Sequence, residues 1–315
     1  MRSRWVLSLL VASFLVNSPV AAQTATLRCF GHAATIVGTA GNDHLVGTGG
    51  TDVIVGRGGN DTILGRGHRD LICGGRGNDI IRGGRGDDHL EGGSGNDRIY
   101  AGSSDRQFLS FRDVMQGDSG DDVLHGAPYR NNNSLVDYSS APGPMAVDLT
   151  AGTAVGDGSD VLVNVDGVVG SAFDDSLNGN RDTNAIAGGD GNDQIWGRGA
   201  ADGLFGDAGN DSLRGGRGAD VVDAGTGRDI LRGGPGGELF MFGGHGNDIL
   251  IGGPGSDRSM YGGYGNDTLL GRSGADRMFG RQGDDSLRGG RGRDVANGGV
   301  GTDTCVAEHR TNCER

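Results

Sequence analysis

The sequence predicts an all-β protein, a right-handed parallel β-solenoid with a short β insert and disulfide-capped ends. The first observation is a nine-residue pattern, Gly-Gly-x-Gly-x-Asp-x-U-x with U a large apolar residue, which recurs along most of the 315 residues. The second is that the 67 glycines lack the three-residue period of collagen. The third is an apolar residue in nearly every copy, which a disordered chain would lack. A nonapeptide period of this kind is typical of a β-helix.

The aspartate of the pattern recurs, mostly every nine residues, in two blocks of repeats. The first block contains Asp43, Asp52, Asp61, Asp70, Asp79, Asp88, Asp97 and, after an interruption, Asp122. The second block contains Asp175, Asp193, Asp202, Asp211, Asp220, Asp229, Asp248, Asp257, Asp267, Asp276, Asp285, Asp294 and Asp303. Asn184 and Glu238 occupy the aspartate position in two turns of this block. The copy at Asp113 lacks its glycines, so Asp113 is left out of the candidate ligands.

The repeats divide the chain into segments. These are a secretory signal at 1–22, an N-terminal cap at 23–37, a first repeat block at 38–126, a β insert at 127–169, a second repeat block at 170–307 and a C-terminal cap at 308–315. Two alternating apolar runs in the insert, Met145/Val147/Leu149 and Val161/Val163/Val165, predict strands with one buried face. A small β insert and a widened pair of solenoid turns both satisfy this pattern.

The first residues of the chain have the features of a secretory signal. Arg2 and Arg4 precede an apolar stretch at 5–16, and Val20, Ala21 and Ala22 are small residues suited to cleavage. The stretch is too short for a membrane span, and no other segment has the length and apolar character to cross a bilayer. We therefore expect a secreted, extracellular protein with no membrane span in the mature chain.

Four cysteines, Cys29, Cys73, Cys305 and Cys313, suggest two disulfides in an exported chain. Three connectivities are possible, and four free thiols are the alternative. We favour Cys29–Cys73 and Cys305–Cys313, because each pair lies at one end of the repeat array. Cys305 occupies a U position in the last turn, so its bond to Cys313 would fold the tail over the end of the core, where solenoids need a cap.

The charge of the chain limits its partners. The formal charge is −13, and loss of Arg2 and Arg4 with the signal takes it to −15. Every cationic residue is an arginine, and most arginines occur singly along the repeats, which is typical of a solvated solenoid face. No nucleic-acid partner is expected, because a basic stripe is not indicated by so acidic a composition.

The nonapeptide predicts a metal ion from its own chemistry. Its Asp-x-U segment predicts a strand of about three residues, too short to stand alone. One buried U residue per repeat does not offset the entropy lost by nine residues rich in glycine. Stacked turns also bring aspartates together, and these carboxylates repel unless a cation lies between them. Aspartates can cap turns without metal, but about twenty copies in register exceed that role.

The available donors select the ion. Calcium takes six to eight oxygen ligands and tolerates irregular geometry, whereas magnesium demands strict octahedral coordination. Zinc would require clustered His or Cys residues, which the sequence lacks. Carboxylates and the carbonyls of glycine-rich turns therefore predict multiple Ca²⁺ ions as the cofactor.

At these residues the chain resembles the RTX, or hemolysin-type calcium-binding repeat, proteins. The best copies are Gly74-Gly75-Arg76-Gly77-Asn78-Asp79 and Gly83-Gly84-Arg85-Gly86-Asp87-Asp88. The resemblance covers about 200 residues and implies a parallel β-roll with two nonapeptides per turn. It also implies that calcium lies between loops stacked on one side, bound by two carboxylates two repeats apart and by loop carbonyls. The implied pairs include Asp43 with Asp61, Asp52 with Asp70, Asp61 with Asp79, Asp193 with Asp211 and Asp276 with Asp294.

On this basis the array predicts on the order of 10–18 ions. The chain departs from the family pattern at His68 and Ala200, which replace a glycine, and at Asn184 and Glu238. Sites that use these four positions should be weak or empty. The stretch from Val136 to Asp175 is similar to a segment between RTX blocks, which favours an insertion within one solenoid. The signal and the cysteines resemble the secreted calcium-binding proteins of high-GC actinobacteria.

We expect a calcium-binding protein without catalytic activity. The sequence contains neither His-Glu-x-x-His nor Gly-x-Ser-x-Gly, and His44, His89 and His125 are interpreted as strand or loop residues. One alternative is a calcium-dependent adhesin that binds cell-surface or matrix glycans. Only Trp196, Tyr261 and Tyr264 are suggestive aromatic contacts for it. A second alternative is a polysaccharide-modifying enzyme that would use carboxylates of the insert, namely Asp157, Asp160 and Asp166.

Overall fold

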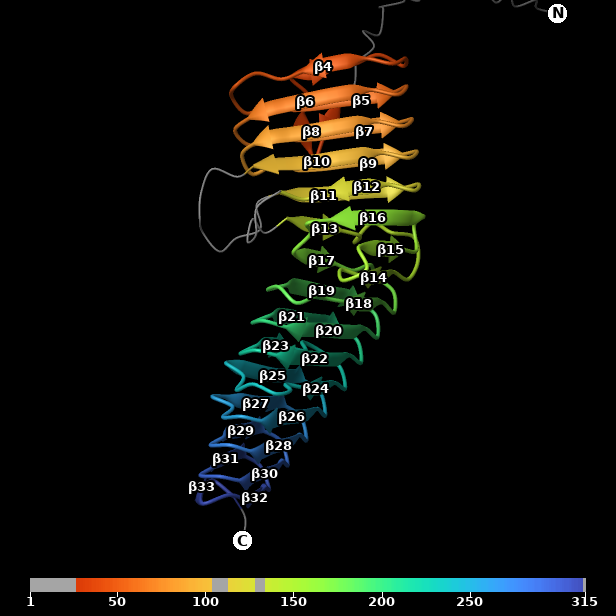
Figure 1. The fold of residues 1–315 in the computed structure, drawn as a ribbon. Helices are drawn as coiled ribbons and strands as arrows, with labels where there is room; N and C mark the ends of the chain where they lie inside the picture. The colour runs from red at the N-terminus through yellow and green to blue at the C-terminus, as the bar shows by residue number, and fades with distance from the viewer. Residues whose placement is uncertain (1–26, 104–112, 128–133, 314–315) are drawn as a thin grey trace, which may run out of the picture.

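The protein is a single long β-solenoid (Figure 1). The computed structural model describes residues 27–103, 113–127 and 134–313, so the expected signal at 1–22 lies outside the described residues. Within these ranges all regular structure is β, and nearly all strand pairs are parallel. The predicted fold class is therefore confirmed. No helix in the described ranges is long and apolar enough to cross a membrane.

Two long sheets face each other across the core. Sheet I has 16 strands in the spatial order β32 (Thr304–Val306), β30 (Ser286–Arg291), β28 (Thr268–Ser273), β26 (Ile249–Pro254), β24 (Ile230–Arg232), β22 (Ser212–Arg217), β20 (Gln194–Gly199), β18 (Ser176–Asn178), β14 (Ala146–Asp148), β15 (Thr153–Val155), β16 (Ser159–Val163), β12 (Val123–His125), β10 (Arg98–Ser103), β8 (Ile80–Arg85), β6 (Thr62–Gly67) and β4 (His44–Val46).

Sheet II has 15 strands in the order β3 (Ile36–Val37), β5 (Val53–Gly58), β7 (Leu71–Arg76), β9 (His89–Ser94), β11 (Val114–Ser119), β13 (Leu135–Asp137), β17 (Gly167–Val169), β19 (Ala185–Asp190), β21 (Gly203–Ala208), β23 (Val221–Asp223), β25 (Phe240–His245), β27 (Met260–Tyr264), β29 (Arg277–Gln282), β31 (Val295–Val300) and β33 (His309–Thr311). A short antiparallel sheet pairs β1 (Arg28–Cys29) with β2 (His32–Ala33).

One turn of the solenoid contains two nonapeptides, so each strand pairs with the strand two repeats later. Ile54 lies beside Ile72 in sheet II, and Ile63 lies beside Ile81 in sheet I. Strands of the regular repeats span six residues and not the predicted three. The difference arises because pairing continues through the glycine pair, where Arg57 pairs with Gly75.

The core is a column of U side chains, one from each strand. The fully or almost fully buried U residues include Ile54, Ile63, Ile72, Ile81, Leu90, Ile99, Ile195, Leu204, Leu213, Val222, Leu231, Leu250, Leu269 and Leu287. Leu45 is only half-buried, because it lies at the open end of the column. Each turn therefore buries its apolar residues mainly against its two neighbours, as in other repeat proteins.

The segment between the two blocks continues both sheets. β13 and β17 are consecutive rungs of sheet II, whereas β14, β15 and β16 form an antiparallel meander in sheet I. β16 pairs with β12 and β14 pairs with β18, so the meander joins the two blocks. A regular turn would place one strand here, and the two additional strands widen sheet I by about 10 Å. The solenoid axis changes direction at this level (Figure 1).

The two strands predicted in the insert differ in outcome. Met145, Val147 and Leu149 are buried, as predicted. The prediction that Val161 and Val163 share a buried face is wrong, because Val161 is 47% exposed and Leu162 is buried between them. β16 adopts the Asp-x-U register of the repeats, with Leu162 beside Leu124, and this register turns the two valines outward.

The N-terminal hairpin covers the outer face of sheet II. Cys29 is buried in a small apolar cluster with Val53, Val55 and Leu71, which are residues of β5 and β7. Cys29 is bonded to Cys73, with a Cα–Cα distance of 5.8 Å, which confirms the predicted pairing. The hairpin thus fixes the first turns from the side, while Ile36 and Leu45 remain partly buried at the end of the core.

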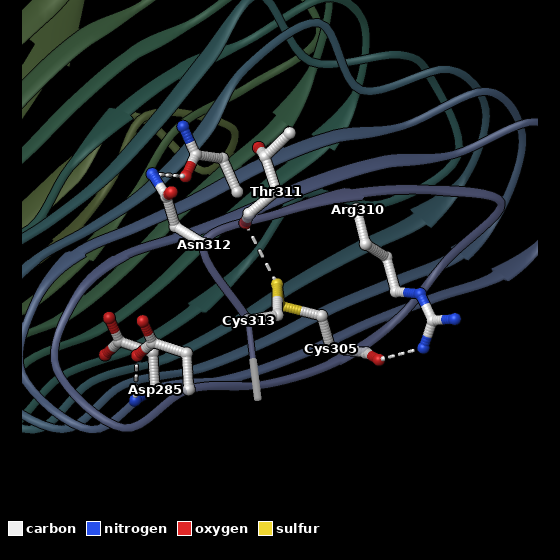
Figure 2. The surroundings of a disulfide bond; sticks show 8 residues. Asp285, Cys305, Arg310, Thr311, Asn312 and Cys313 are labelled. Carbon is white, nitrogen blue, oxygen red and sulfur yellow. Dashed lines mark hydrogen bonds between the residues drawn. A yellow bond between two sulfur atoms is a disulfide. The ribbon is translucent and has the colours of Figure 1, made fainter. Parts of the chain in front are cut away.

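The C-terminal tail covers the other end of the core (Figure 2). Cys305 is 3% exposed in the last U position and is bonded to Cys313, which confirms the second predicted disulfide. β33 adds one more rung to sheet II beside β31, and Ala307 and Cys313 lie against the core. The Arg310 guanidinium donates a hydrogen bond of 3.2 Å to the Cys305 carbonyl oxygen.

The buried column predicts a large position-specific effect of side-chain truncation. Ile81 is 0% exposed, whereas its neighbour Ile80 is half-buried on the outer face of the same strand. With calcium present, I81A should lower the free energy of unfolding by about 2–5 kcal/mol because it leaves a cavity. I80A is the matched control and should lower it by about 1 kcal/mol or less. Urea unfolding followed by circular dichroism measures both, and equal losses would contradict this description of the core.

Candidate calcium centres

Each repeat aspartate lies at the end of a turn, and all of them except Asp257 immediately precede a strand. Stacking places it next to the aspartate one full turn later, and the backbone N–H of the first donates a hydrogen bond to Oδ1 of the second. The N–O distance is 2.7 Å from Asp61 to Asp79 and 2.9 Å from Asp52 to Asp70. Repetition of this contact produces two ladders of carboxylates, one beside each sheet.

The structure brings the predicted site residues together in these ladders. The ladder beside sheet I contains Asp43, Asp61, Asp79, Asp97, Asp122, Asp175, Asp193, Asp211, Asp229, Asp248, Asp267, Asp285 and Asp303. The ladder beside sheet II contains Asp52, Asp70, Asp88, Asp202, Asp220, Asp257, Asp276 and Asp294. The aspartates that the resemblance pairs are consecutive rungs, and their role as ligands stays a prediction.

The second carboxylate oxygen of most rungs is buried and without a hydrogen-bond partner. Every predicted aspartate except Asp43 is at most 5% exposed. Oδ2 lacks a partner in Asp61, Asp70, Asp79, Asp88, Asp97, Asp122, Asp193, Asp202, Asp211, Asp220, Asp229, Asp248, Asp257, Asp267, Asp276, Asp285, Asp294 and Asp303. A buried ionised oxygen without a partner is strongly unfavourable, so these atoms are candidate ligands for a cation.

Three rungs satisfy this oxygen within the protein. Oδ2 of Asp43 and Asp52 accepts hydrogen bonds from the backbone N–H and the hydroxyl of Thr39 and Thr48, at 2.6–3.0 Å. Ser171 holds Asp175 with the same two kinds of donor, but its N–H donates to Oδ2 and its hydroxyl donates to Oδ1. Asp43 and Asp52 are the first predicted rungs of their ladders, and Asp175 is the first predicted rung of the second block. Each block therefore begins with a carboxylate that depends less on an ion.

Backbone carbonyls lie close to the unpartnered oxygens. A Cβ atom added to Gly243 would lie 2.6 Å from Asp248 Oδ2 and 2.6 Å from the carbonyl oxygen of Gly262, which belongs to the next turn. The same two kinds of oxygen converge beside Gly197, Gly206, Gly262 and Gly271. A side chain added at these glycines would lie too close to both oxygens, which favours glycine here, although Ala101 and Ala224 occupy the equivalent position in their turns.

The donor set fits calcium. In the ranges that the structure describes, no three His, Cys, Asp or Glu side chains group to hold a metal. An ion in the ladders would therefore take carboxylate oxygens from stacked turns and complete its shell with carbonyls or water. Such an all-oxygen set from flexible loops suits Ca²⁺ and does not suit zinc. When bound, the ion would neutralise the carboxylates and join consecutive turns.

Comparison with known families agrees with this geometry. The family model for the RTX calcium-binding nonapeptide repeat matches residues 31–63, 46–81, 74–107, 109–127, 169–204, 178–213, 205–237, 240–258, 259–287 and 279–308, which together cover well over half of the chain. The protein belongs to the RTX calcium-binding repeat family. No curated protein matches the chain.

Burial of the RTX aspartates weakens their acidity. It raises the pKa of Asp88 to about 8. The neighbouring Asp113 and Asp70 carboxylates raise this pKa further, whereas the hydrogen bond from the Asp70 N–H lowers it. Burial likewise raises the pKa of Asp97 to about 7 and that of Asp79 to about 6. Without a cation, Asp88 and Asp97 therefore resist ionisation near neutral pH.

The positions that depart from the RTX pattern keep their place in the solenoid. His68 and Ala200 adopt positive φ values of 69° and 67°, so the loops are preserved at some cost in backbone strain. Asn184 joins the sheet II ladder, and its Oδ1 accepts a hydrogen bond from Asn180 N–H. Glu238 is 1% exposed, and neither of its carboxylate oxygens has a hydrogen-bond partner. The expectation of weak or empty sites at these four positions stays a prediction.

The structure adds rungs that the sequence interpretation missed. Asp160 accepts hydrogen bonds from Asp122 N–H and from the Tyr138 hydroxyl, and Glu308 accepts one from Asp294 N–H. Asp113, set aside because its glycines are absent, is buried and accepts a hydrogen bond from Asp88 N–H. The Asp-x-U triplet at Asp160-Val161-Leu162 was the available signal, whereas Glu308 is not followed by an apolar U residue.

Removal of one ladder charge should change stability in opposite directions with and without calcium. D79N keeps the Oδ1 acceptor for Asp61 N–H but removes a charge from the buried oxygen. We expect it to raise the calcium concentration at half-folding and to reduce the number of bound ions, while stabilising any ion-free solenoid. D87N, in an exposed loop, is the matched control and should change neither the calcium concentration at half-folding nor the number of bound ions. Circular dichroism titration and native mass spectrometry provide the readouts.

Protons should partly replace calcium. Burial raises the folded-state pKa of Asp79 to about 6, that of Asp97 to about 7 and that of Asp88 to about 8, above the ordinary value of 3.8. The stability contributed by a raised pKa is complete below the unfolded value and is lost as pH rises through the folded value. Metal-free protein should therefore gain β structure at pH 4 and lose it as the pH rises from 6 to 8. Circular dichroism at micromolar concentration measures this, and greater metal-free stability at pH 8 would contradict it.

Proposed function

We propose that this protein is a secreted calcium-binding β-roll whose folding is driven by Ca²⁺ bound between stacked Gly/Asp turns, and that it has no catalytic activity of its own. The observation that carries the proposal is the buried carboxylate oxygen without a hydrogen-bond partner in nearly every turn. An ion-free solenoid would hold these charges close together in a poorly solvated interior, and calcium would remove that penalty.

Coupling of folding to calcium follows from the weakness of the other interactions. Each nonapeptide contributes one U side chain to the core, and its glycines lose more conformational entropy than other residues. Extracellular calcium-binding modules have dissociation constants of about 10⁻⁴–10⁻³ M. Sites of this affinity would fill outside the cell and stay largely empty in the cytosol, so the chain would remain unfolded until export. We propose on the order of 10–18 ions for the whole array.

Two features support an extracellular location. The N-terminal residues have the composition of a secretory signal, and both cysteine pairs form disulfides. Structural disulfides persist in oxidising compartments and are rare in the cytosol.

A non-catalytic role is the simpler interpretation of the insert carboxylates. Asp160, one of the three residues that the enzyme alternative requires, is buried and accepts hydrogen bonds from Tyr138 and Asp122. It therefore serves as a rung of the sheet I ladder. His44, His89 and His125 lie in strands β4, β9 and β12, and His125 stacks on Tyr100 at a centroid distance of 4.7 Å.

The proposal predicts a calcium-driven transition of the mature chain. Residues 23–315 should show little β signal in EGTA and acquire it cooperatively at about 10⁻⁴–10⁻³ M calcium. Magnesium at the same concentrations should be much less effective, because it demands octahedral geometry and retains its waters. Far-UV circular dichroism measures both titrations, and native mass spectrometry counts the ions. A strong β signal and unchanged melting temperature after complete chelation at neutral pH would disprove calcium-driven folding.

A further inference from the structure

The acidic composition hides a basic surface. In the part of the chain that the structure describes, 23 Asp and Glu side chains are buried, almost all of them in the two ladders. All 22 described arginines are exposed, whereas 16 of the described acidic side chains lie outside the core. The accessible surface of this region therefore carries an excess of six positive charges, although the whole chain has a formal charge of −13.

The largest share of the exposed arginines lies on the outer side of sheet I in the second block. From Gln194 onward, the acidic residues in the strands of this sheet and in the loops that follow them are the ladder aspartates and two glutamates, the buried Glu238 and the exposed Glu308. The same strands and loops carry Arg198, Arg214, Arg217, Arg232, Arg258, Arg272, Arg288, Arg291 and Arg293. Sheet II in this block instead carries Asp190, Asp207 and Asp223. The two faces therefore differ in charge.

Two shallow clefts lie on this basic face. The first has a volume of about 300 Å³ and is lined by Trp196, Arg198, Arg214, Arg217 and Pro235. Arg198 forms an ion pair of 3.1 Å with Asp148, whereas no ion pair engages Arg214 or Arg217 in the described residues. Trp196 is 45% exposed, so its apolar ring is accessible beside free guanidinium groups.

The second cleft repeats this combination on strands β28 to β32. It has a volume of about 570 Å³ and is lined by Leu270, Arg272, Arg288, Arg291 and Val306. Val306 is 58% exposed. The central strands of the two clefts, β22 and β30, are four rungs apart, or about 19 Å at the spacing of paired strands. One extended chain could therefore lie across both clefts.

This arrangement suits an acidic polysaccharide better than a nucleic acid. Guanidinium groups bind carboxylates in a bidentate manner, and the apolar cleft residues suit the C–H faces of sugar rings. Single-stranded nucleic acids require several aromatic residues on which successive bases stack, but Trp196 is the one aromatic residue on this face from β20 to β32. The rings of Phe242, Tyr261 and Phe279 lie on sheet II and stack on one another, so their faces are already engaged.

We propose that the outer face of sheet I between β20 and β32 binds a carboxylate-bearing polysaccharide through its arginine-lined clefts. The inference goes beyond the proposed calcium-driven folding and rests on it in one respect, since calcium would both order the face and neutralise the buried carboxylates beneath it. Binding therefore requires calcium even though the ion does not touch the polymer.

A charge-matched pair of variants tests the assignment. One variant combines R214Q, R217Q, R288Q and R291Q on the sheet I face, and the control combines R57Q, R76Q, R228Q and R277Q on the sheet II side. All eight arginines are exposed. Fluorescence anisotropy of labelled hyaluronate oligosaccharides, a uronate polymer, measures binding in 5 mM CaCl₂ with dextran as the neutral probe. Circular dichroism verifies that each variant folds.

We expect wild-type protein to bind hyaluronate in calcium, with affinity that falls as NaCl rises, and not to bind dextran. The sheet I variant should bind about tenfold more weakly, since four exposed ion pairs each contribute modestly, and the sheet II variant should stay within about twofold. Equal weakening by both variants would indicate a general charge effect or calcium bridging and would overturn the proposal. Absent hyaluronate binding, or tighter binding of poly(dT), would also overturn it. Arginine-dependent binding that persists in EGTA would instead refute only calcium-driven folding.

Discussion

The structure depends on a buried carboxylate that each turn presents to the previous one. Oδ1 closes the stack by accepting the N–H of the aspartate one turn earlier, and Oδ2 is left in a dry interior. The hydrogen bond to Oδ1 sets the register of the sheets, whereas the unpartnered Oδ2 requires a positive charge nearby. The same residue type therefore specifies the fold and makes it conditional on an ion. The turn glycines leave space beside the carboxylate oxygens. The narrow core contributes one apolar side chain per repeat and therefore leaves the fold dependent on this aspartate.

Placing so many acidic groups inside reverses the usual relation between composition and surface. The isoelectric point of about 4.8 describes the unfolded chain and says little about what a partner meets. Among the residues that the structure describes, the exposed charged side chains are mainly arginines, which lie on strands or loops outside the core. Partner predictions based on net charge alone therefore fail for a solenoid that buries one sign of charge, and the two faces of the sheet pair must be considered separately.

The sequence predicts those parts of the structure in which the spacing is regular. The aspartate run, the U column and both disulfides follow from the period and from the positions of four cysteines. The missed rungs have irregular spacing: Asp160 is 38 residues from Asp122, and Glu308 is 14 residues from Asp294. The outward position of Val161 was also missed, because alternation of apolar residues does not indicate which of two neighbouring residues faces the core. Pairing of β16 with β12 places Leu162 inward and Val161 outward. The basic outer face of sheet I could not be predicted from the sequence, because its prediction requires knowledge of which charged side chains are buried.

The hydroxyl groups at Thr39, Thr48 and Ser171 give the molecule a direction. They hold the leading carboxylates of each block without help from solution, and most later carboxylates accept a hydrogen bond from a backbone N–H that the preceding turn already presents. Assembly can thus start at two places and advance toward the C-terminus, one coil at a time, as repeat proteins allow. In a chain that emerges N-terminus first, the turns that contain these hydroxyl groups would be available before the turns that stack on them. The Cys305–Cys313 disulfide would then close the C-terminal end of the solenoid last.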